Sequence, residues 1–147
     1  MSEPPASPKL FGDLLALARG AWVREMALRL NRLGYLDYRR SDAIALRWLR
    51  HGQVPLGDVA ATLGVSRQAA RKVVDGLVER GFARLERDRV DGRRLNVELS
   101  NDGTRYARAV LEVITQLNHD VESQVAAYDL EMVKDVLRTV ASRYGTA

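Results

Sequence analysis

The amino-acid sequence predicts a mainly α-helical α+β fold, built from a helix-turn-helix, a small β-hairpin and long helices at both ends. Two short helical patterns lie on either side of Gly64-Val65-Ser66. Farther along, apolar and polar residues alternate on both sides of Asp91-Gly92, as they do in a half-buried hairpin. Both ends of the chain carry apolar stripes with three- and four-residue spacing, which indicate amphipathic helices. Together these patterns predict a winged helix-turn-helix lobe with long N- and C-terminal dimerisation helices.

The composition fits one cytoplasmic domain with a moderate excess of positive charge. The chain has 147 residues and a net charge of +4, which permits a nucleic-acid partner but does not establish one. Because it has no cysteine and only two histidines, we expect no disulfide, no metal site and no cofactor. No apolar run reaches the length of a membrane span and the N-terminus lacks a signal-peptide core, so we expect a cytoplasmic protein without a membrane partner.

We expect a single winged-helix domain over residues 9–147, after a disordered, proline-rich tail over residues 1–8. Within the domain, residues 38–100 form the helix-turn-helix lobe, and residues 9–34 and 102–145 form the long helices. The apolar stripes of the long helices exceed what the core of the lobe needs. We therefore expect a homodimer that buries them, because a monomer would expose an apolar patch too large for a soluble protein.

Two helices precede the helix-turn-helix. The first runs from about Lys9 to Leu33, and the second begins at the N-cap residue Ser41 and ends at Gly52. Half of the apolar face of the first helix is expected to contact a partner, whereas the apolar side chains of the second are expected to point inward. The apolar residues are Leu10, Leu14, Leu17, Ala18, Ala21, Trp22, Met26 and Leu30 in the first helix and Ile44, Trp48 and Leu49 in the second.

The helix-turn-helix itself extends from Leu56 to Gly81. Gly64 ends its first helix, where a residue with positive φ is needed, and the Ser66 hydroxyl accepts hydrogen bonds from the first amides of the second helix. Val65, between them, is expected to point inward. The remaining apolar positions are Val59, Ala60 and Leu63 in the first helix and Ala70, Val73, Val74, Leu77 and Val78 in the second.

The opposite face of the second helix carries long hydrogen-bond donors. Four of them lie at i, i+1, i+4 and i+5 in its first two turns: Arg67, Gln68, Arg71 and Lys72. Such side chains suit the major groove of DNA, because arginine and lysine recognise guanine, glutamine recognises adenine, and either cation binds phosphate. A solvated cationic helix face is the alternative interpretation of the same pattern.

The hairpin is expected to form a wing beside this helix, with Asp91-Gly92 in its turn. Because a two-stranded hairpin is not stable alone in water, its apolar face of Leu85, Leu95 and Val97 must pack on the helix-turn-helix. Asp91 is expected to orient Arg93 or to shape the turn. The tip carries a cluster of arginines that can enter a minor groove or bind the DNA backbone: Arg87, Arg89, Arg93 and Arg94. A solvated charged loop is the alternative.

Two striped helices close the chain, one over about Asp102 to Val125 and one from Tyr128. The lobe is complete without them, so we expect them to form the dimer interface together with the first helix. Their apolar positions are Tyr106, Val110, Val113, Ile114, Leu117, Val121 and Val125, followed by Leu130, Val133, Val136, Leu137, Val140 and Tyr144.

The sequence resembles the MarR family of bacterial winged helix-turn-helix transcriptional regulators. The resemblance covers residues 10–145 and is most specific in GVSRQAARKVVDGLVERGF, in the wing ERDRVDGRRLNVELS and in the LSNDG that follows. An Asp-x-Arg pair is typical of the family's wing, here Asp91-Gly92-Arg93. The resemblance implies an obligate homodimer that binds a pseudo-palindromic operator in double-stranded DNA, and often a repressor. Peroxide-sensing members use a cysteine, which this chain lacks.

The resemblance also implies roles for individual residues. The family's base-reading positions correspond to Gln68, Ala69, Arg71 and Lys72, with Ser66 and Arg67 near phosphate and Arg93, with Arg89, in the wing. Relatives often carry hydroxyl residues where this chain has Ala69-Ala70, so an operator sequence cannot be transferred. Many members release DNA when a small aromatic or phenolic effector binds beside the lobe. Residues that offer aromatic walls and a cation for such an effector are Trp22, Arg24, Trp48 and His51.

The sequence therefore predicts a sequence-specific transcriptional regulator, a ligand-responsive repressor. The alternative is a winged-helix protein-interaction module without sequence-specific DNA binding. We do not expect an enzyme, because no glycine-rich phosphate loop follows a strand and no nucleophile–histidine arrangement or metal-ligand spacing stands out. His51 with Ser41 or Asp42 could be imagined as a catalytic group, but helix surfaces routinely carry such residues.

Overall fold

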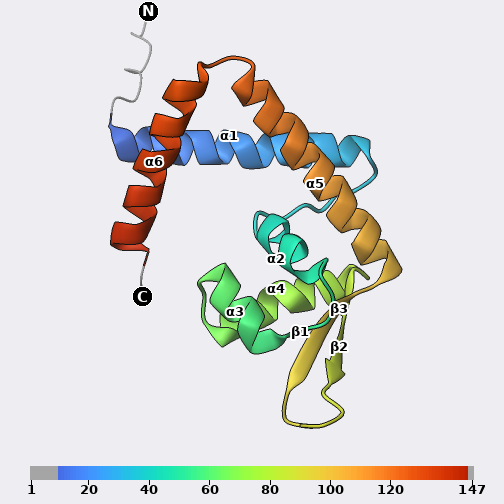
Figure 1. Cartoon of the computed structure of the whole chain (residues 1–147). Coiled ribbons are helices and arrows are strands. Elements are labelled where there is room, and N and C mark those ends of the chain that lie inside the picture. The colour runs from blue at the N-terminus through green and yellow to red at the C-terminus, as the bar shows by residue number, and fades with distance from the viewer. Residues whose placement is uncertain (1–9, 146–147) are drawn as a thin grey trace, which may run out of the picture. The chain divides into compact units, whose positions relative to one another are not determined.

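The computed structural model describes residues 10–145, so the tail expected over residues 1–8 lies outside the described residues (Figure 1). The chain divides into two compact units, the second of which begins at Ile114. In chain order the elements are α1 (Phe11–Arg32), α2 (Asp42–Leu49), β1 (Val54–Pro55), α3 (Leu56–Leu63), α4 (Arg67–Glu79), β2 (Ala83–Arg87), β3 (Leu95–Leu99), α5 (Asn101–Glu122) and α6 (Ala127–Tyr144). This order confirms the predicted mainly helical winged fold.

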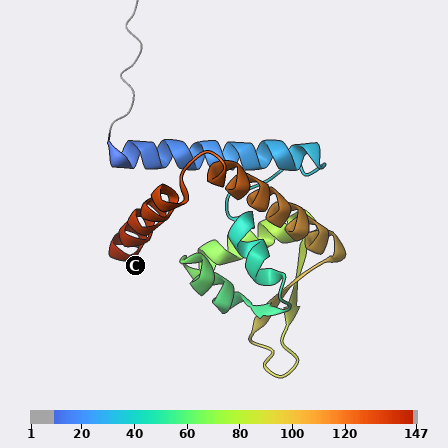
Figure 2. The same cartoon turned by 45° about the horizontal axis from the view of Figure 1, so that its top comes forward.

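The helix-turn-helix and the hairpin are joined by a strand that the sequence patterns did not reveal. The antiparallel sheet has the order β1-β3-β2, and β1 pairs Val54 with Val97 of the central strand. Because β1 leads directly into α3, this pairing attaches the start of the helix-turn-helix to the hairpin. Figure 2 shows the β2–β3 hairpin extending beyond α3 and α4.

The core of the first unit is formed by one face of each helix and by the inner face of the sheet. Val97 is buried, as expected, and Leu85 and Leu95 are half-buried. Only the C-terminal half of α1 enters the core, while its N-terminal apolar residues are exposed. The largest buried apolar side chains are Met26, Leu30, Leu46, Leu49, Val59, Val74, Leu77, Val97, Tyr106, Val110 and Val113.

Several apolar side chains of α2 to α4 that were expected to point inward are exposed, among them Ile44, Trp48, Val65 and Val78. In α2 the buried residues Asp42, Ala45, Leu46 and Leu49 follow the i, i+3, i+4, i+7 spacing. Ile44 and Trp48, which are 41% and 42% exposed, form an i, i+4 pair on another face, so their assignment to the core was wrong. The expectation for Val65 was also wrong. Its amide donates to the Ala60 carbonyl and closes α3, but its side chain is 43% exposed.

The start of α2 is also fixed differently from the prediction. Ser41 has helical backbone angles and its side chain makes no capping hydrogen bond. Instead the Asp42 carboxylate accepts from the Arg39 amide at 3.0 Å. The predicted start is therefore correct to within a residue, but no side chain caps α2, and the Asp42 carboxylate holds the amide of Arg39 in the preceding turn.

The wing loop is organised by Asp88, a residue that the turn prediction did not single out. Its Oδ1 accepts from the amides of Val90 and Asp91 at 2.8 and 3.1 Å, and its Oδ2 accepts from the Asn96 amide group at 3.1 Å. Hydrogen bonds from the Asp91 and Val90 amides and from Asn96 lower the pKa of Asp88. Asp91 shapes the turn as expected, because its Oδ1 accepts from the Arg93 amide at 3.1 Å.

The second unit contains the end of α5 and all of α6. The apolar positions expected to point inward from α6 are exposed or half-buried in the single chain, and Val133, Val136, Leu137 and Tyr144 are among the exposed ones. The homodimer that would bury them stays a prediction. Among residues 10–145, no helix has both the length and the hydrophobicity needed to cross a membrane.

Candidate nucleic-acid interface

The turn between α3 and α4 fixes the first turn of α4, as the sequence predicted. Gly64 has φ +65° and ψ 35°, the left-handed conformation that ends α3 without a Cβ penalty. Ser66 is extended, and its Oγ accepts from the Ala69 amide at 3.1 Å. This hydrogen bond satisfies one of the first amides of α4, which have no acceptor within the helix.

One face of α4 is buried and the other presents the predicted donors to solvent. Ala70, Val74 and Leu77 are buried, whereas the side chains at the predicted reading positions are exposed apart from a half-buried Ala69. Arg71 is not free along this face. Its Nε donates to Asp75 Oδ1 at 2.8 Å, one turn farther along the helix. The exposed donors of the first two turns are Arg67, Gln68, Arg71 and Lys72.

The arginines of the wing divide into paired and unpaired groups. Arg84 pairs with Glu98 across the strands at 3.0 Å, and Arg87 donates to the Gly92 carbonyl at 2.9 Å. Arg89, Arg93 and Arg94 are exposed. Within residues 10–145, no hydrogen bond or ion pair found in the structure uses the guanidinium groups of these three. Only the second group therefore presents unengaged guanidinium groups for an external anion.

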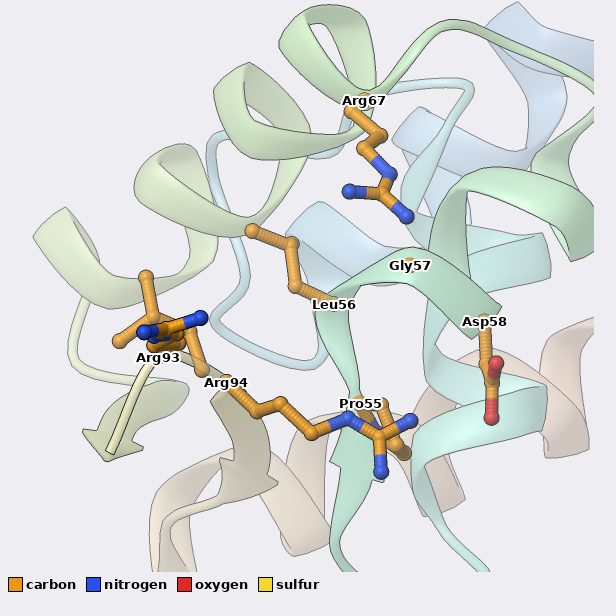
Figure 3. Close-up of a pocket in the computed structure, with 8 residues that line it drawn as sticks. Pro55, Leu56, Gly57, Asp58, Arg67, Arg93 and Arg94 are labelled. Atoms are coloured by element: carbon orange, nitrogen blue, oxygen red, sulfur yellow. The ribbon is translucent and has the colours of Figure 1, made fainter. Parts of the chain in front are cut away.

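A cavity of about 340 Å³ lies between α3, α4 and the hairpin. Figure 3 shows Arg67 extending from α4 toward Gly57, and Arg94 extending from the hairpin toward Pro55. The Arg67 Nη2 lies 3.7 Å from the point that a Cβ on Gly57 would occupy. The residues that line the cavity are Pro55, Leu56, Gly57, Asp58, Arg67, Arg93, Arg94 and Leu95.

This cavity brings together two predicted site residues, Arg67 and Arg93, with two that the site prediction omitted. Arg94 was expected in the basic cluster of the wing but was given no role of its own. Gly57 gave no sequence signal, because its importance comes from its place under the Arg67 side chain. The other predicted positions on α4 and in the wing loop do not line this cavity.

Of the four residues named for an effector, Trp22, Arg24, Trp48 and His51, none lines a second cavity in the first unit. That cavity, of about 290 Å³, is lined by Gly34, Tyr35, Leu36, Asp37, Arg80, Phe82 and Tyr106. Its walls are aromatic: the ring centroids of Phe82 and Tyr106 lie 4.3 Å apart in a stacked pair, and those of Tyr35 and Tyr106 lie 4.8 Å apart in a tilted pair. Trp22, Trp48 and His51 are absent from its lining.

Beside this second cavity lies a buried charged cluster that sequence reasoning missed. The Asp42 carboxylate accepts from Arg80 Nη1 and Nη2 at 2.7 and 2.9 Å and from the Tyr106 hydroxyl at 2.8 Å. The Arg80 Nε and Nη1 also donate to the carbonyls of Gly76 and Asp37, each at 2.8 Å. The cluster thus joins α2, the end of α4 and the start of α5.

The environment of this cluster perturbs two of its groups. Burial raises the pKa of Tyr106 far above its usual range, and the negative charge and hydrogen bond of Asp42 raise it further. Burial opposes the charge on Arg80, but the hydrogen bond and charge of Asp42 more than offset it, so the pKa of Arg80 is raised. Tyr106 and Arg80 therefore keep their protons and remain hydrogen-bond donors.

The comparisons with known proteins agree with this geometry. A sequence model described as the MarR family matches residues 36–94. The PcaV transcriptional regulator from Streptomyces coelicolor, in complex with its natural ligand, is 25% identical, with a TM-score of 0.74 over 93% of this chain and 97% of that chain. The S. aureus MepR–DNA complex is 17% identical, with a TM-score of 0.80 over 92% of this chain and 99% of that chain.

A third structure, that of BpsR from Bordetella bronchiseptica, is 19% identical and has a TM-score of 0.75 over 95% of this chain and 98% of that chain. No curated protein matches the chain in sequence. Among residues 10–145, no group of three or more histidine, aspartate or glutamate side chains gathers in a way that could hold a metal ion.

Proposed function

We propose that the chain is a transcriptional regulator of the MarR family, whose model matches residues 36–94, and that it binds a pseudo-palindromic operator in double-stranded DNA as a homodimer. The observation that carries the proposal is the division of α4 into a buried apolar face and an exposed face of long donors, beside a wing with unpaired arginines. In this proposal the protein binds DNA, does not catalyse a reaction, and acts in the cytoplasm.

In this proposal α4 enters the major groove. Gln68 donates to and accepts from adenine, Arg71 binds guanine, and Ala69 contacts a thymine methyl group. Lys72 binds phosphate or guanine, and Arg67 binds phosphate. Ser66 holds the first turn of α4 in place through its bond to the Ala69 amide, close to the backbone. Arg71 is already oriented by Asp75, so its guanidinium loses less freedom on binding.

The wing binds the flanking minor groove or its backbone through Arg89 and Arg93. The Asp91 carboxylate holds the Arg93 amide and so fixes where this side chain leaves the loop. A narrow, A·T-rich minor groove attracts such arginines because its negative potential is enhanced. Arg84 and Arg87 contribute less, since they are engaged within the hairpin.

The homodimer follows from the apolar faces that the single chain leaves exposed. In α1 these include Leu10, Phe11, Leu14 and Leu17, and in α6 they include Val133 and Val136. Burying one such side chain stabilises an interface by about 1.5–3 kcal/mol. A symmetric dimer places two copies of α4 in successive major grooves when they are about 34 Å apart.

We further propose that a small aromatic or phenolic effector shifts the separation of the two lobes. PcaV was solved with its natural ligand, and 6-hydroxynicotinic acid is described as regulating DNA binding by BpsR. In this chain the proposed contacts are Trp22, Trp48 and His51, together with whatever the second copy adds. The shift is limited by the difference in affinity of the effector for the two states of the dimer.

Fluorescence anisotropy tests the DNA proposal. The protein is titrated at about 150 mM salt into the DNA upstream of its own gene and into a scrambled duplex, and specific binding is expected to be roughly a thousandfold tighter. Arg71→Ala should weaken operator binding by about 1–3 kcal/mol. The matched control is Arg138→Ala, which removes an arginine that lies outside the lobe and pairs with Asp135.

Equal and weak binding to both duplexes, even at low salt, would contradict the proposal and favour the protein-interaction module. Binding that discriminates between the duplexes but ignores Arg71→Ala would retain the function and remove Arg71 from the reading face.

A further inference from the structure

Three guanidinium groups and a single carboxylate line the cavity between α3, α4 and the hairpin. Among the described residues, no hydrogen bond or ion pair in the structure engages the guanidinium groups of Arg67, Arg93 or Arg94. Other arginine side chains of this lobe form ion pairs within the chain, such as Arg71 with Asp75 and Arg84 with Glu98. Three guanidinium groups against one carboxylate leave the cavity with an excess of positive charge, so it favours the entry of an anion.

The start of α3 adds hydrogen-bond donors to this cavity. Its N-cap residue is Pro55, and no side chain caps the helix. The first amides of an α-helix have no acceptor within the helix, and here those of Leu56, Gly57 and Asp58 belong to residues that line the cavity. Gly57 has no side chain, which leaves the backbone accessible. The guanidinium of Arg67 lies above it, with Nη2 3.7 Å from the position of a Cβ.

From the cavity, its unengaged arginines and the uncapped helix start, we infer that this cavity binds one phosphate group of the DNA backbone, held jointly by Arg67, Arg94 and the first amides of α3. The inference rests on the proposed function and makes it more specific. It adds Arg94 and Gly57 to the interface. It also assigns Arg67 to the backbone, because its side chain is directed toward Gly57, so the reading of bases falls to Gln68, Arg71 and Lys72 (Figure 3).

The position of the cavity indicates a DNA phosphate as the source of the anion. Arg67 is the first residue of α4, and Arg94 directly precedes β3 of the wing. The two elements proposed to enter neighbouring grooves thus both contribute cations to the same cavity, Arg67 from α4 and Arg94 with Arg93 from the wing, and the phosphate backbone is what separates neighbouring grooves. A phosphate bound there sets the register of the lobe on DNA without reading sequence.

Asp58 lines the same cavity and carries the opposite charge. Its charge reduces the attraction for phosphate. Removing that charge should therefore change the DNA affinity in the direction opposite to the removal of an arginine. Asp58→Asn keeps the size of the side chain and removes its charge, so it should tighten binding to any duplex. Replacing Arg67 or Arg94 in the same cavity by a neutral residue should weaken binding to any duplex.

The test is a salt titration of anisotropy with the full-length protein, the operator and the scrambled duplex. Arg94→Gln and Arg67→Gln should each weaken binding to both duplexes by the same factor, and Asp58→Asn should strengthen it. Each phosphate contact that is lost makes the slope of log K against log salt less steep by about 0.9. Because the two arginines share one phosphate, the double variant should lose no more than about 0.9 in total. Arg84→Gln is the matched control, since Arg84 lies in the same hairpin but is paired with Glu98.

Several outcomes would overturn the inference. A double variant that loses about twice the slope of one contact would mean that the arginines bind separate phosphates. Unchanged slopes in Arg94→Gln, alongside a loss of specificity in Arg71→Ala, would overturn the phosphate cavity and leave the proposed function intact. A wild-type protein that fails to bind DNA would remove both.

A second probe separates a DNA phosphate from a free anion. Sodium sulfate, compared with sodium chloride at equal ionic strength, is added to the protein alone while the Gly57 amide is followed by NMR. Weak binding at Gly57 that is displaced by the duplex supports the inference. Tight sulfate binding that depends on Arg94 but is indifferent to DNA would make this a site for a free anion and would overturn it.

Discussion

Arginine has opposite roles in two regions of this lobe. Arg80, at the end of α4, has a side chain that is 12% exposed and donates to a buried carboxylate and to two carbonyls. Arg67, at the start of the same helix, points into an open cavity that it shares with Arg94. One helix thus carries an arginine that stabilises the fold and another that is available to a partner. The difference comes from what surrounds each guanidinium and not from the residue type.

The buried region is satisfied within the chain. Asp42, whose side chain is 1% exposed, accepts from the Arg39 amide, from Arg80 and from Tyr106. No buried side-chain nitrogen or oxygen in the described part of the chain lacks a partner. Such a cluster holds α2, α4 and α5 in one arrangement, because losing any member leaves a buried polar group without its hydrogen bond. The cavity at the other end of α4 shows the reverse, with cations that are satisfied only by something the chain does not supply.

The largest effect is expected from removing the carboxylate of Asp42, at the centre of the buried cluster. Asp42→Ala leaves Arg80 buried without its counter-charge, and removing one partner of a buried ion pair costs about 3–5 kcal/mol. We expect a loss of that size in the free energy of unfolding, measured by urea denaturation. Asp37→Ala is the control, because its exposed carboxylate pairs with Arg39 at the surface while its carbonyl still binds Arg80. Equal losses in the two variants would refute a special role for the buried cluster.

A smaller effect should follow from removing a single hydrogen bond in the same cluster. Tyr106→Phe keeps the ring stacked on Phe82 and deletes the hydroxyl that donates to Asp42. Hydrogen bonds to charged groups contribute about 1.5–3 kcal/mol, so we expect a loss in this range. The measurement is again urea denaturation. A stability unchanged from that of the wild type would mean that Arg80 and the Arg39 amide alone satisfy Asp42.

These two variants concern the region that the sequence did not predict, and the reason is physical. Asp42 and Arg80 are 38 positions apart, and Asp42 and Tyr106 are 64 apart. No periodic pattern links positions so distant in the chain. Local signals also misled the prediction, because a serine before a helix suggests a cap, whereas Asp42 holds the Arg39 amide and the charged cluster together.

The exposed region was predicted well because its signals are local. Gly64 and Ser66 mark the turn by their own backbone and side-chain chemistry, and the structure confirms both. The apolar stripe of α4 predicts which side is buried and hence that Gln68 and Lys72 are exposed. What the sequence left undetermined was the direction of each side chain. That Arg67 extends over Gly57 depends on how α3 and α4 cross.

The cap of α4 allows a test on the exposed side of the comparison. Ser66→Ala removes the acceptor for the Ala69 amide, and such caps contribute about 1 kcal/mol. We expect this modest loss of stability together with weaker operator binding, because the first turn of α4 carries Arg67 and Gln68. Ser66→Asp keeps a capping acceptor and should restore the stability. Restored stability with binding still impaired would indicate that the hydroxyl itself, or the new negative charge, affects the DNA contact.

The smallest expected effect is a dependence of the wing loop on pH. Hydrogen bonds from the amides of Asp91 and Val90 and from Asn96 lower the pKa of Asp88 below that of an unfolded aspartate. A carboxyl with a lowered folded pKa contributes stability above its unfolded pKa and loses it as the pH falls through the folded value. The loop should therefore keep its hydrogen bonds at neutral pH and lose them only at pH values below the ordinary range of aspartate.

The Val90 and Asp91 amide shifts, followed by NMR during an acid titration, report this transition directly, because both amides donate to Asp88 Oδ1. Asp88→Asn preserves an acceptor but cannot titrate, so both amides should lose the transition that belongs to residue 88. If the wild-type amides instead titrate at the ordinary aspartate pKa or above it, the loop does not stabilise the charged carboxylate. The placement of Arg89 and Arg93 would then depend on the strands and on DNA, and not on a preformed loop.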